Sequence, residues 1–342
     1  MATAIEILNT IRDNSSAAYA RLVPAVTKGN FAQVGQAITS DSNIMNEFIK
    51  GLINKVALSH IKSKLFNNPL AKLKSQGVPM GNTIEEIFIN PAEDMGFQKD
   101  GTYLLKNYTP DAKVAYYAMN RQSTYPASIF LTDLKKGLRS INDFNSFYGK
   151  IVTSLYSGDN IDEFMLCKKM IGLAADNNHC MIVPCDLAQP KEVSKLITTM
   201  SKNFAFPKVD FAPYNIVNAE KIAAEKGTKC NTFCERKNQV LLMANDTDTE
   251  IGYEVLATMF HTEPAAIEAM TILIDDFPSE KYDIYAVLCD KESIQMRDVI
   301  LQTESKFIES NLSWNIWLHH FQHQYISMFG NFVVFAKEKA TP

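Results

Sequence analysis

The sequence has no long run of apolar residues and no positively charged leader. No window of about 18 apolar residues occurs in the 342-residue chain, and a membrane-spanning helix needs roughly that length. The start, from Met1 to Asn9, carries Glu6 where a secretory signal would carry lysine or arginine. We therefore expect neither a membrane segment nor a signal peptide.

Motifs that carry enzymatic chemistry are also missing. The chain has no GxxxxGK followed by Ser or Thr, no GxGxxG after a strand and no GxSxG elbow. Its six cysteines are scattered, and the CxxxC pair of Cys230 and Cys234 has no histidine to complete a zinc site. We expect reduced thiols in a reducing cytosol, no catalytic residue, no metal and no cofactor.

One histidine cluster deserves comparison with metal sites. In the run from His319 to His323, the first and last residues would share one face of a helix, which is a spacing that zinc sites use. The residues from Trp314 to His319 alternate as in a strand, however, and no adjacent glutamate supplies the base of a zinc protease. The sequence therefore predicts no metal site here.

The composition is that of a globular protein, but its charge is unevenly distributed. Apolar residues make up 46% and charged residues 21%, which allows a sizeable core. The net charge of -4 argues against a body that binds nucleic acid all over. Between Phe48 and Ile84 there is no acidic residue and there are six lysines, so the rest of the chain is -10 (-4 minus +6). This basic segment suits an acidic patch on a neighbour, packaged phosphate or simple solvation.

Residues 1–40 are weakly patterned, with short helices expected at Ala4–Arg12 and Asn30–Thr39. Asn43 to Val56 has helical spacing, and Ala57 to Leu65 alternates as a strand or continues the helix. A segment with so little core of its own is interpreted as an arm that needs a partner. Thr83 to Asn90 and Val114 to Asn120 alternate as strands, and a polar loop joins them. An isolated hairpin is marginal in water, so this one must lie on its own body or on another subunit.

The body reads as α+β. Ile141–Ser157 has helical periodicity, Gly158 is expected to break it, and Asp159 is expected to cap a second helix. Short strands and helices then follow without the βαβα rhythm of a doubly wound fold. The strands are expected at Met181–Val183, Val240–Ala244, Thr271–Ile274, Tyr285–Cys289, Ser293–Val299, Leu312–Phe321 and Asn331–Ala336, and the helices at Pro190–Asn203, Ile251–Phe260 and Pro264–Met270.

Several short motifs, in a preserved order over nearly the whole chain, resemble the major capsid proteins of phi29-like phages, short-tailed podoviruses among the tailed bacteriophages. They are Asn67-Asn68-Pro69-Leu70, Pro79, Gly81, Thr83-Ile84-Glu85-Glu86-Ile87, Asn120-Arg121-Gln122, Asp290-Lys291 and Trp314-Asn315. The resemblance implies the Hong Kong 97-like capsid fold. On that basis we expect an N-terminal arm (1–82), an extended hairpin or E-loop (83–122), a peripheral domain with a spine helix (123–184 and 309–342) and an axial domain (185–308). No surface domain is expected after Pro342.

The same resemblance implies a structural protein of the virion, assembled in the bacterial cytoplasm. Pentamers and hexamers would build an icosahedral head around double-stranded DNA, with scaffolding and portal proteins as further partners and no membrane. The alternatives are an encapsulin-like non-viral shell and a cytosolic thiol or metal-dependent enzyme. Intersubunit contacts are expected at Ile84, Glu85, Glu86, Ile87, Phe88 and Arg121, the last also anchoring the hairpin base, and contacts of the arm with a neighbour or with DNA at Lys62, Lys64, Lys72 and Lys74.

Overall fold

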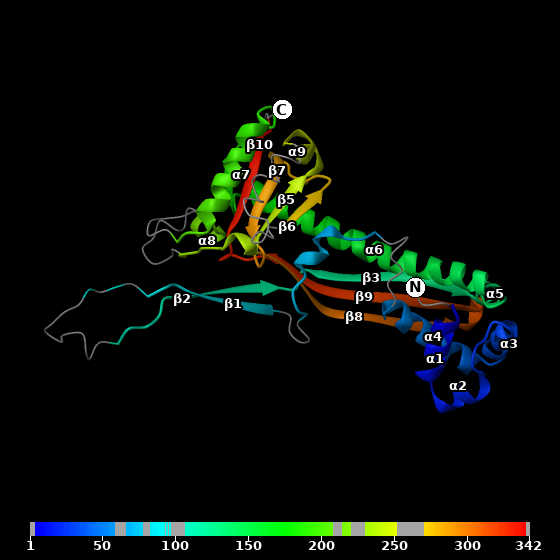
Figure 1. The fold of residues 1–342 in the computed structure, drawn as a ribbon. Coiled ribbons are helices and arrows are strands. Elements are labelled where there is room, and N and C mark those ends of the chain that lie inside the picture. The colour runs from blue at the N-terminus through cyan, green and yellow to red at the C-terminus, as the bar shows by residue number, and fades with distance from the viewer. Residues whose placement is uncertain are drawn as a thin grey trace. The chain divides into compact units, whose positions relative to one another are not determined.

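The computed structural model describes residues 4–58, 66–77, 83–92, 94, 96, 107–207, 214–219, 230–251 and 270–339 (Figure 1). The chain folds into two compact units that each draw on three stretches of sequence. Unit 1 contains Met1–Asn68, Arg121–Glu163 and Asp298–Gln322, and unit 2 contains Pro69–Asn120, Phe164–Arg297 and His323–Pro342. The helices expected over 252–269 lie outside the described residues, as does the alternating stretch from His60 to Leu65.

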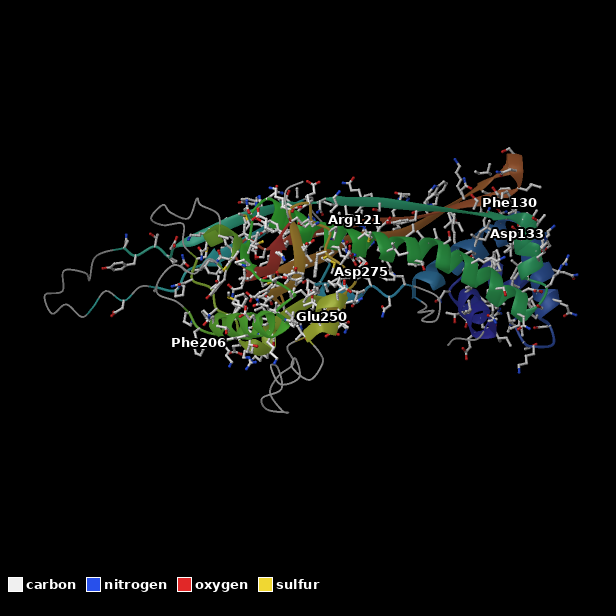
Figure 2. The ribbon with its side chains drawn as sticks, turned by 90° about the horizontal axis from the view of Figure 1, so that it is seen from above. Arg121, Phe130, Asp133, Phe206, Glu250 and Asp275 are labelled. Atoms are coloured by element: carbon white, nitrogen blue, oxygen red, sulfur yellow. The ribbon has the colours of Figure 1, made fainter. Side chains whose placement is uncertain are left out.

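Unit 1 is built on a three-stranded sheet in the order β3-β9-β8. β3 (Arg121–Phe130) has Arg121 and Phe130 at its two ends (Figure 2). It pairs antiparallel with β9 (Ser313–Ile326), and β8 (Ile294–Ile308) lies on the other side of β9. A short helix, η4 (Glu309–Asn311), turns β8 into β9, and α5 (Leu131–Gly137) follows β3 directly. The strands expected from the sequence at the starts of β8 and β9 are confirmed, and both continue further.

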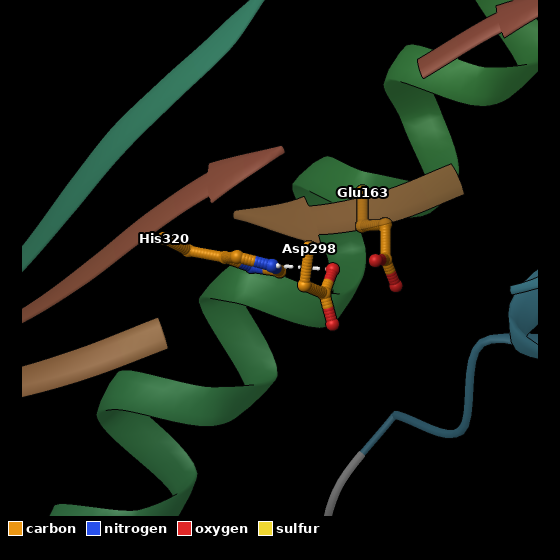
Figure 3. Close-up of side chains that lie close together, drawn as sticks. All are labelled: Glu163, Asp298 and His320. Carbon is orange, nitrogen blue, oxygen red and sulfur yellow. Dashed lines mark hydrogen bonds and ion pairs between the residues drawn. The ribbon is translucent and has the colours of Figure 1, made fainter. Parts of the chain in front are cut away.

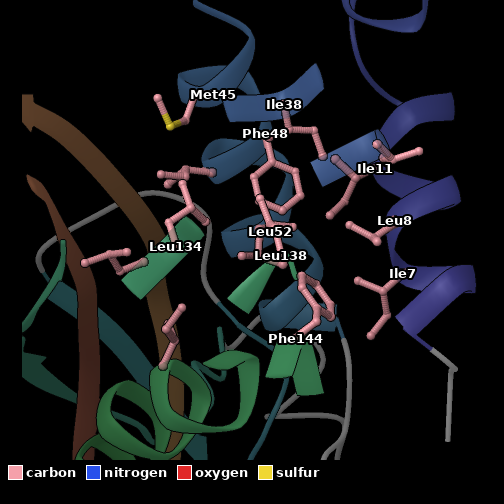
Figure 4. Close-up of a cluster of buried hydrophobic side chains, with 14 of the residues drawn as sticks. Ile7, Leu8, Ile11, Ile38, Met45, Phe48, Leu52, Leu134, Leu138 and Phe144 are labelled. Atoms are coloured by element: carbon pink, nitrogen blue, oxygen red, sulfur yellow. The ribbon is translucent and has the colours of Figure 1, made fainter. Parts of the chain in front are cut away.

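Four N-terminal helices complete the core of unit 1. They are α1 (Ala4–Asp13), α2 (Ala17–Leu22), α3 (Phe31–Ser40) and α4 (Ser42–Leu58). Ile11 of α1 and Phe48 of α4 converge with Phe144 in one buried cluster (Figure 4). The indole of Trp314 in β9 joins it and donates a hydrogen bond to Asn46. The expectation of a segment with little core of its own is therefore wrong, because each short helix contributes a few side chains to a shared cluster.

A single helix, α6 (Ile141–Asp176), runs through 36 residues. The break expected at Gly158 is wrong, and Asp159 does not cap a new helix but lies buried within α6. Glycine inside a helix costs only about 1 kcal/mol relative to alanine. Leu155 and Ile171 are fully buried on either side of it, and burial of one such side chain contributes roughly 1.5–3 kcal/mol. Packing therefore outweighs the local preference to stop.

Unit 2 contains a five-stranded mixed sheet in the order β4-β10-β7-β5-β6. Its strands are β4 (Met181–Pro184), β10 (Phe332–Glu338), β7 (Tyr282–Asp290), β5 (Gln239–Ala244) and β6 (Met270–Ile274). All five strands that the sequence predicted in these stretches are confirmed. β10 pairs with β4, from the segment 123–184 that the sequence grouped with 309–342, and with β7.

Both faces of this sheet are covered. Leu242 and Val334 pack on one face with Ile171 of α6, whereas Leu241 and Phe335 pack on the other face with the helix α7 (Pro190–Phe204). Burial on two faces explains why every residue of β5 is buried, as in the continuous apolar runs of covered sheets. The shorter helices of unit 2 are η1 (Pro69–Leu73), α8 (Ile216–Ala219), η3 (Arg236–Asn238) and α9 (Asn245–Ile251).

Gly172 lets α6 approach a loop of unit 2 closely, and Gly172→Ala is expected to destabilise the protein by more than about 2 kcal/mol. An added Cβ would lie 1.7 Å from the backbone oxygen of Pro278, so the main chain itself must move. Gly149 on the same helix has nothing within 4 Å of its would-be Cβ. Gly149→Ala is therefore the matched control and should stabilise by about 0.5–1 kcal/mol. Urea unfolding of both variants measures the contrast, and equal stabilities would contradict it.

Candidate functional site

The expected hairpin is present as a two-stranded antiparallel sheet in unit 2. β1 (Thr83–Ile89) and β2 (Ala112–Ala118) pair so that Glu85 lies opposite Tyr116 and Ile87 opposite Val114. Successive side chains of a strand point to opposite faces. The hairpin therefore has two faces of different character, called here the inner face and the outer face.

The inner face carries Ile84, Glu86, Phe88 and Tyr117, and its last three members contact unit 2. The Glu86 carboxylate accepts hydrogen bonds from Tyr117 (2.5 Å) and from the hydroxyl of Ser327 (2.7 Å). Phe88 stacks on Phe329 with ring centroids 5.4 Å apart. These contacts attach the hairpin to its own unit, so the side chains of Glu86 and Phe88 are engaged within the subunit.

The outer face carries Glu85 and four large apolar side chains that have little cover. Ile87 is 59% exposed, Ile89 60%, Val114 46% and Tyr116 67%. The Tyr116 hydroxyl donates to the Glu85 carboxylate at 3.1 Å. The sequence singled out Ile87 but missed Ile89, Val114 and Tyr116. Alternation along β1 could have added Ile89, whereas the β2 residues required the pairing register.

Arg121, which follows the hairpin, lies inside unit 1. Its guanidinium is 3% exposed and contacts the Asp159 carboxylate at 2.6 Å, the Tyr125 hydroxyl at 3.1 Å and the Gln322 side-chain oxygen at 3.1 Å. The structure therefore places the Arg121 side chain among buried partners of its own unit.

A buried ionic cluster forms around this arginine, and it includes the group of described residues that most resembles a metal site. The side-chain ligand atoms of Glu163, Asp298 and His320 lie within 4.8 Å of one another (Figure 3). The Gln322 amide already donates to Glu163 at 2.6 Å and to Asp298 at 2.7 Å, and His320 contacts Asp298 at 3.0 Å. Hydrogen bonds thus account for this grouping without a cation.

The sequence compared His319 and His323 with a metal pair and predicted no metal site, and it did not single out His320. His319, on the opposite face of β9, contacts the Thr124 hydroxyl at 3.0 Å near the surface. His320 instead is 1% exposed and faces carboxylates on α6 and β8. Only the three-dimensional pairing of β9 with α6 and β8 distinguishes the two.

The basic residues expected to contact a neighbour or DNA are only partly described. Lys72 is exposed on η1, and Lys74, just after it, is partly buried and bridges to Met296. Lys62 and Lys64 lie outside the described residues. The two lysines that are described therefore lie on and just after η1, with Lys74 bridged to the start of β8.

A pocket of about 470 Å³ beside the hairpin includes a buried carboxylate, that of Asp290. It is lined by Glu86 and Phe88 of the hairpin and by Asp290 and Glu292 of the turn after β7. One Asp290 oxygen accepts from the backbone N–H of Asn331 at 2.8 Å, and the other is buried near the Cys234 thiol. Burial raises the pKa of Asp290 from 3.8 to about 6.

Asp290→Asn is expected to stabilise the protein by about 1–2 kcal/mol above pH 7. The folded state disfavours the charged Asp290 carboxylate. The loss of folding stability that this causes in the wild type is therefore complete above pH 6 and disappears as the pH falls towards 3.8. The advantage of the variant should vanish over the same window. Glu292→Gln, which removes an exposed charge from the same pocket, should change stability by less than about 0.5 kcal/mol. Denaturant unfolding from pH 4 to 8 tests this, and a pH-independent difference would refute it.

Comparisons with known proteins agree over almost the whole chain. The family model of phi29-like phage major capsid proteins matches residues 8–336. The major capsid protein of Bacillus phage B103 is 26% identical over 98% of this chain and 74% of its own length. That of Streptococcus phage Cp-1 is 25% identical over 98% of this chain and 95% of its own.

Solved structures show the same fold at low sequence identity. The capsid structure of Staphylococcus phage Andhra has a TM-score of 0.63 at 12% identity and covers 83% of this chain and 87% of its own. The head structure of Helicobacter pylori bacteriophage KHP40 has a TM-score of 0.52 at 7% identity, covering 82% and 93%. Among the described helices, none is both long enough and apolar enough to cross a bilayer.

Proposed function

The chain belongs to the family of phi29-like phage major capsid proteins, and on that premise we propose that the outer face of its hairpin joins neighbouring subunits in the shell. The protein is a structural subunit of the virion with the α+β Hong Kong 97-like capsid fold, and it self-assembles into the icosahedral head. Pentamers and hexamers are the assembly units in this proposal. It assigns no catalytic residue, metal or cofactor to the chain.

The observation that carries the proposal is the apolar outer face. Four large side chains are about half or more exposed on a narrow two-stranded ribbon. A clustered apolar surface of this kind marks a site of association in soluble proteins. Burying such a side chain contributes roughly 1.5–3 kcal/mol, and the contribution recurs at every subunit of a closed symmetric shell.

The polar member of the outer face adds specificity. Glu85 is exposed and is held by Tyr116, so we assign it a basic partner on the neighbouring subunit. A cross-interface pair at the rim governs register and association rate more than affinity. In this proposal Glu86, Phe88 and Ile84, on the inner face, hold the hairpin to its own unit.

Further partners follow from the same premise. The lysines between Phe48 and Ile84, including Lys62, Lys64, Lys72 and Lys74, are proposed to contact packaged double-stranded DNA or an acidic patch on the next subunit. Scaffolding and portal proteins are proposed partners during assembly. The names arm, E-loop, peripheral and axial domain for the segments bounded at 82, 122, 184 and 308 belong to the proposal as well.

Electron microscopy of the purified chain across concentration and salt tests the function. Rings of five or six subunits, or closed shells, are expected, with scaffold co-expressed if the chain alone stays monomeric. Subunits that remain monomeric in both settings would contradict it. If the lysines bind phosphate, DNA retention should fall steeply with salt, whereas contact with a protein patch would leave it nearly unchanged.

A further inference from the structure

Both ring nitrogens of His320 face carboxylate oxygens. Nδ1 lies 2.7 Å from Asp159 on α6 and 3.2 Å from the Arg121 guanidinium on β3, and Nε2 lies 3.0 Å from Asp298 on β8. A neutral imidazole has one N–H and one lone pair, so one nitrogen would direct its lone pair at a negatively charged oxygen. Only the imidazolium donates to both carboxylates at once.

The charges around the ring favour the same state. On α6, Asp159 and Glu163 face the cluster, and Asp162 reaches it through the Tyr125 hydroxyl. β3 supplies Arg121, β8 supplies Asp298, and β9 supplies the neutral amide of Gln322. The carboxylates next to the ring and to Arg121 are those of Asp159, Glu163 and Asp298. If the ring is neutral, their charge of -3 is offset by the single positive charge of Arg121, and the cluster carries a net charge of -2. Protonation reduces this to -1, which matters because unbalanced buried charge is costly.

We propose that His320 acts as a protonation-dependent clasp, in which the imidazolium links Asp159 on α6 to Asp298 on β8 within unit 1, and loss of its proton breaks this link and loosens β8. No remote partner is needed, because the three residues come from α6, β8 and β9 of one unit. The clasp makes the rigidity of this sheet depend on pH. It does not depend on the assembly role of the hairpin.

The direction of the pH effect follows from the local interactions. Burial lowers the pKa of His320, but the hydrogen bonds to Asp159 and Asp298 outweigh it and the net shift from 6.5 is upward. A raised pKa in the folded state means that the stabilisation is complete below 6.5 and is lost as the pH rises through the folded value. Alkaline rather than acidic conditions should therefore open the clasp.

Nuclear magnetic resonance of the histidine-labelled full chain, as free subunits, tests the proposal directly. The His320 ring should remain an imidazolium above pH 6.5. His320→Gln identifies the signal by removing it. A His320 ring that is already neutral at pH 6.5 would overturn the clasp, and this reading uses the wild-type chain alone.

Hydrogen exchange of the backbone amides then tests whether deprotonation of His320 loosens β8. After correction for the intrinsic pH dependence, exchange of the β8 amides beyond Asp298 should increase at least tenfold across the His320 titration. The step should disappear in His320→Gln and persist in His319→Gln, which changes the neighbouring histidine on the other face of β9. β8 exchange that ignores the titration, or a step that survives in His320→Gln, would also overturn the proposal.

Discussion

The double variant Ile87→Asp with Val114→Lys is expected to leave the subunit folded and to abolish the shell. The two residues lie directly opposite each other on the outer face and are 59% and 46% exposed. Opposite charges across a strand pair stabilise a hairpin, so the fold should lose no more than about 1 kcal/mol. The face that we assign to the neighbour, by contrast, becomes charged, and burying it would cost desolvation at every interface.

The matched control for this variant keeps the face apolar. Ile87→Val with Val114→Ile exchanges the two side chains across the hairpin and preserves its apolar volume, so shells should form as in the wild type. Circular dichroism and thermal unfolding establish folding, and electron microscopy and sedimentation measure assembly. Normal shells from the charged variant would remove the outer face from the interface.

Arg121→Met is expected to destabilise the subunit by about 3–5 kcal/mol. The arginine pairs with Asp159 at 2.6 Å and lies 3.9 Å from Glu163, and these carboxylate side chains are 7% and 2% exposed. Its removal leaves their buried negative charge uncompensated by the guanidinium, and the methionine restores only the volume. The stability of Arg121→Lys should lie between those of the wild type and Arg121→Met, because a lysine cannot bond Asp159, Tyr125 and Gln322 together.

A second substitution separates lost charge balance from lost packing. If the cost of Arg121→Met comes from the uncompensated carboxylate, then adding Asp159→Asn should recover about 1–3 kcal/mol. Asp162→Asn, which changes a carboxylate on the same helix that bonds only Tyr125, should recover less. Denaturant unfolding of six chains, the wild type, the three single variants and the two double variants, completes both cycles. Equal recovery by both second substitutions would mean that packing, not charge, sets the cost.

Local patterns were sufficient for most strands and for helices such as α1, α3 and α7, but they failed at the middle of α6. Alternation identified both strands of the hairpin and most strands of the two sheets, because each is bounded by turn residues and buried on a defined face. The break expected at Gly158 failed because tertiary packing of α6 outweighs one glycine. The core of the N-terminal helices was missed because α1, α3 and α4 become apolar enough only when they are combined.

The candidate site could also be predicted only in part. Ile87 was predicted from its strand, but the partners that complete the outer face come from β2 and depend on register. The cluster around Arg121 could not have been predicted, because Arg121 and His320 are 199 residues apart and Asp159 and His320 are 161 apart. Sequence periodicity carries no information about such contacts. Arg121 was chosen from its motif, and the structure gives it an internal role.

The most direct test of the intersubunit role is an electron cryomicroscopy map of heads assembled from this chain. The account predicts that Ile87, Val114 and Tyr116 contact a second subunit in every hexamer, with Glu86 and Phe88 still on Ser327 and Phe329 of their own. A map in which the outer face of the hairpin meets solvent, while other surfaces hold the shell together, would contradict it.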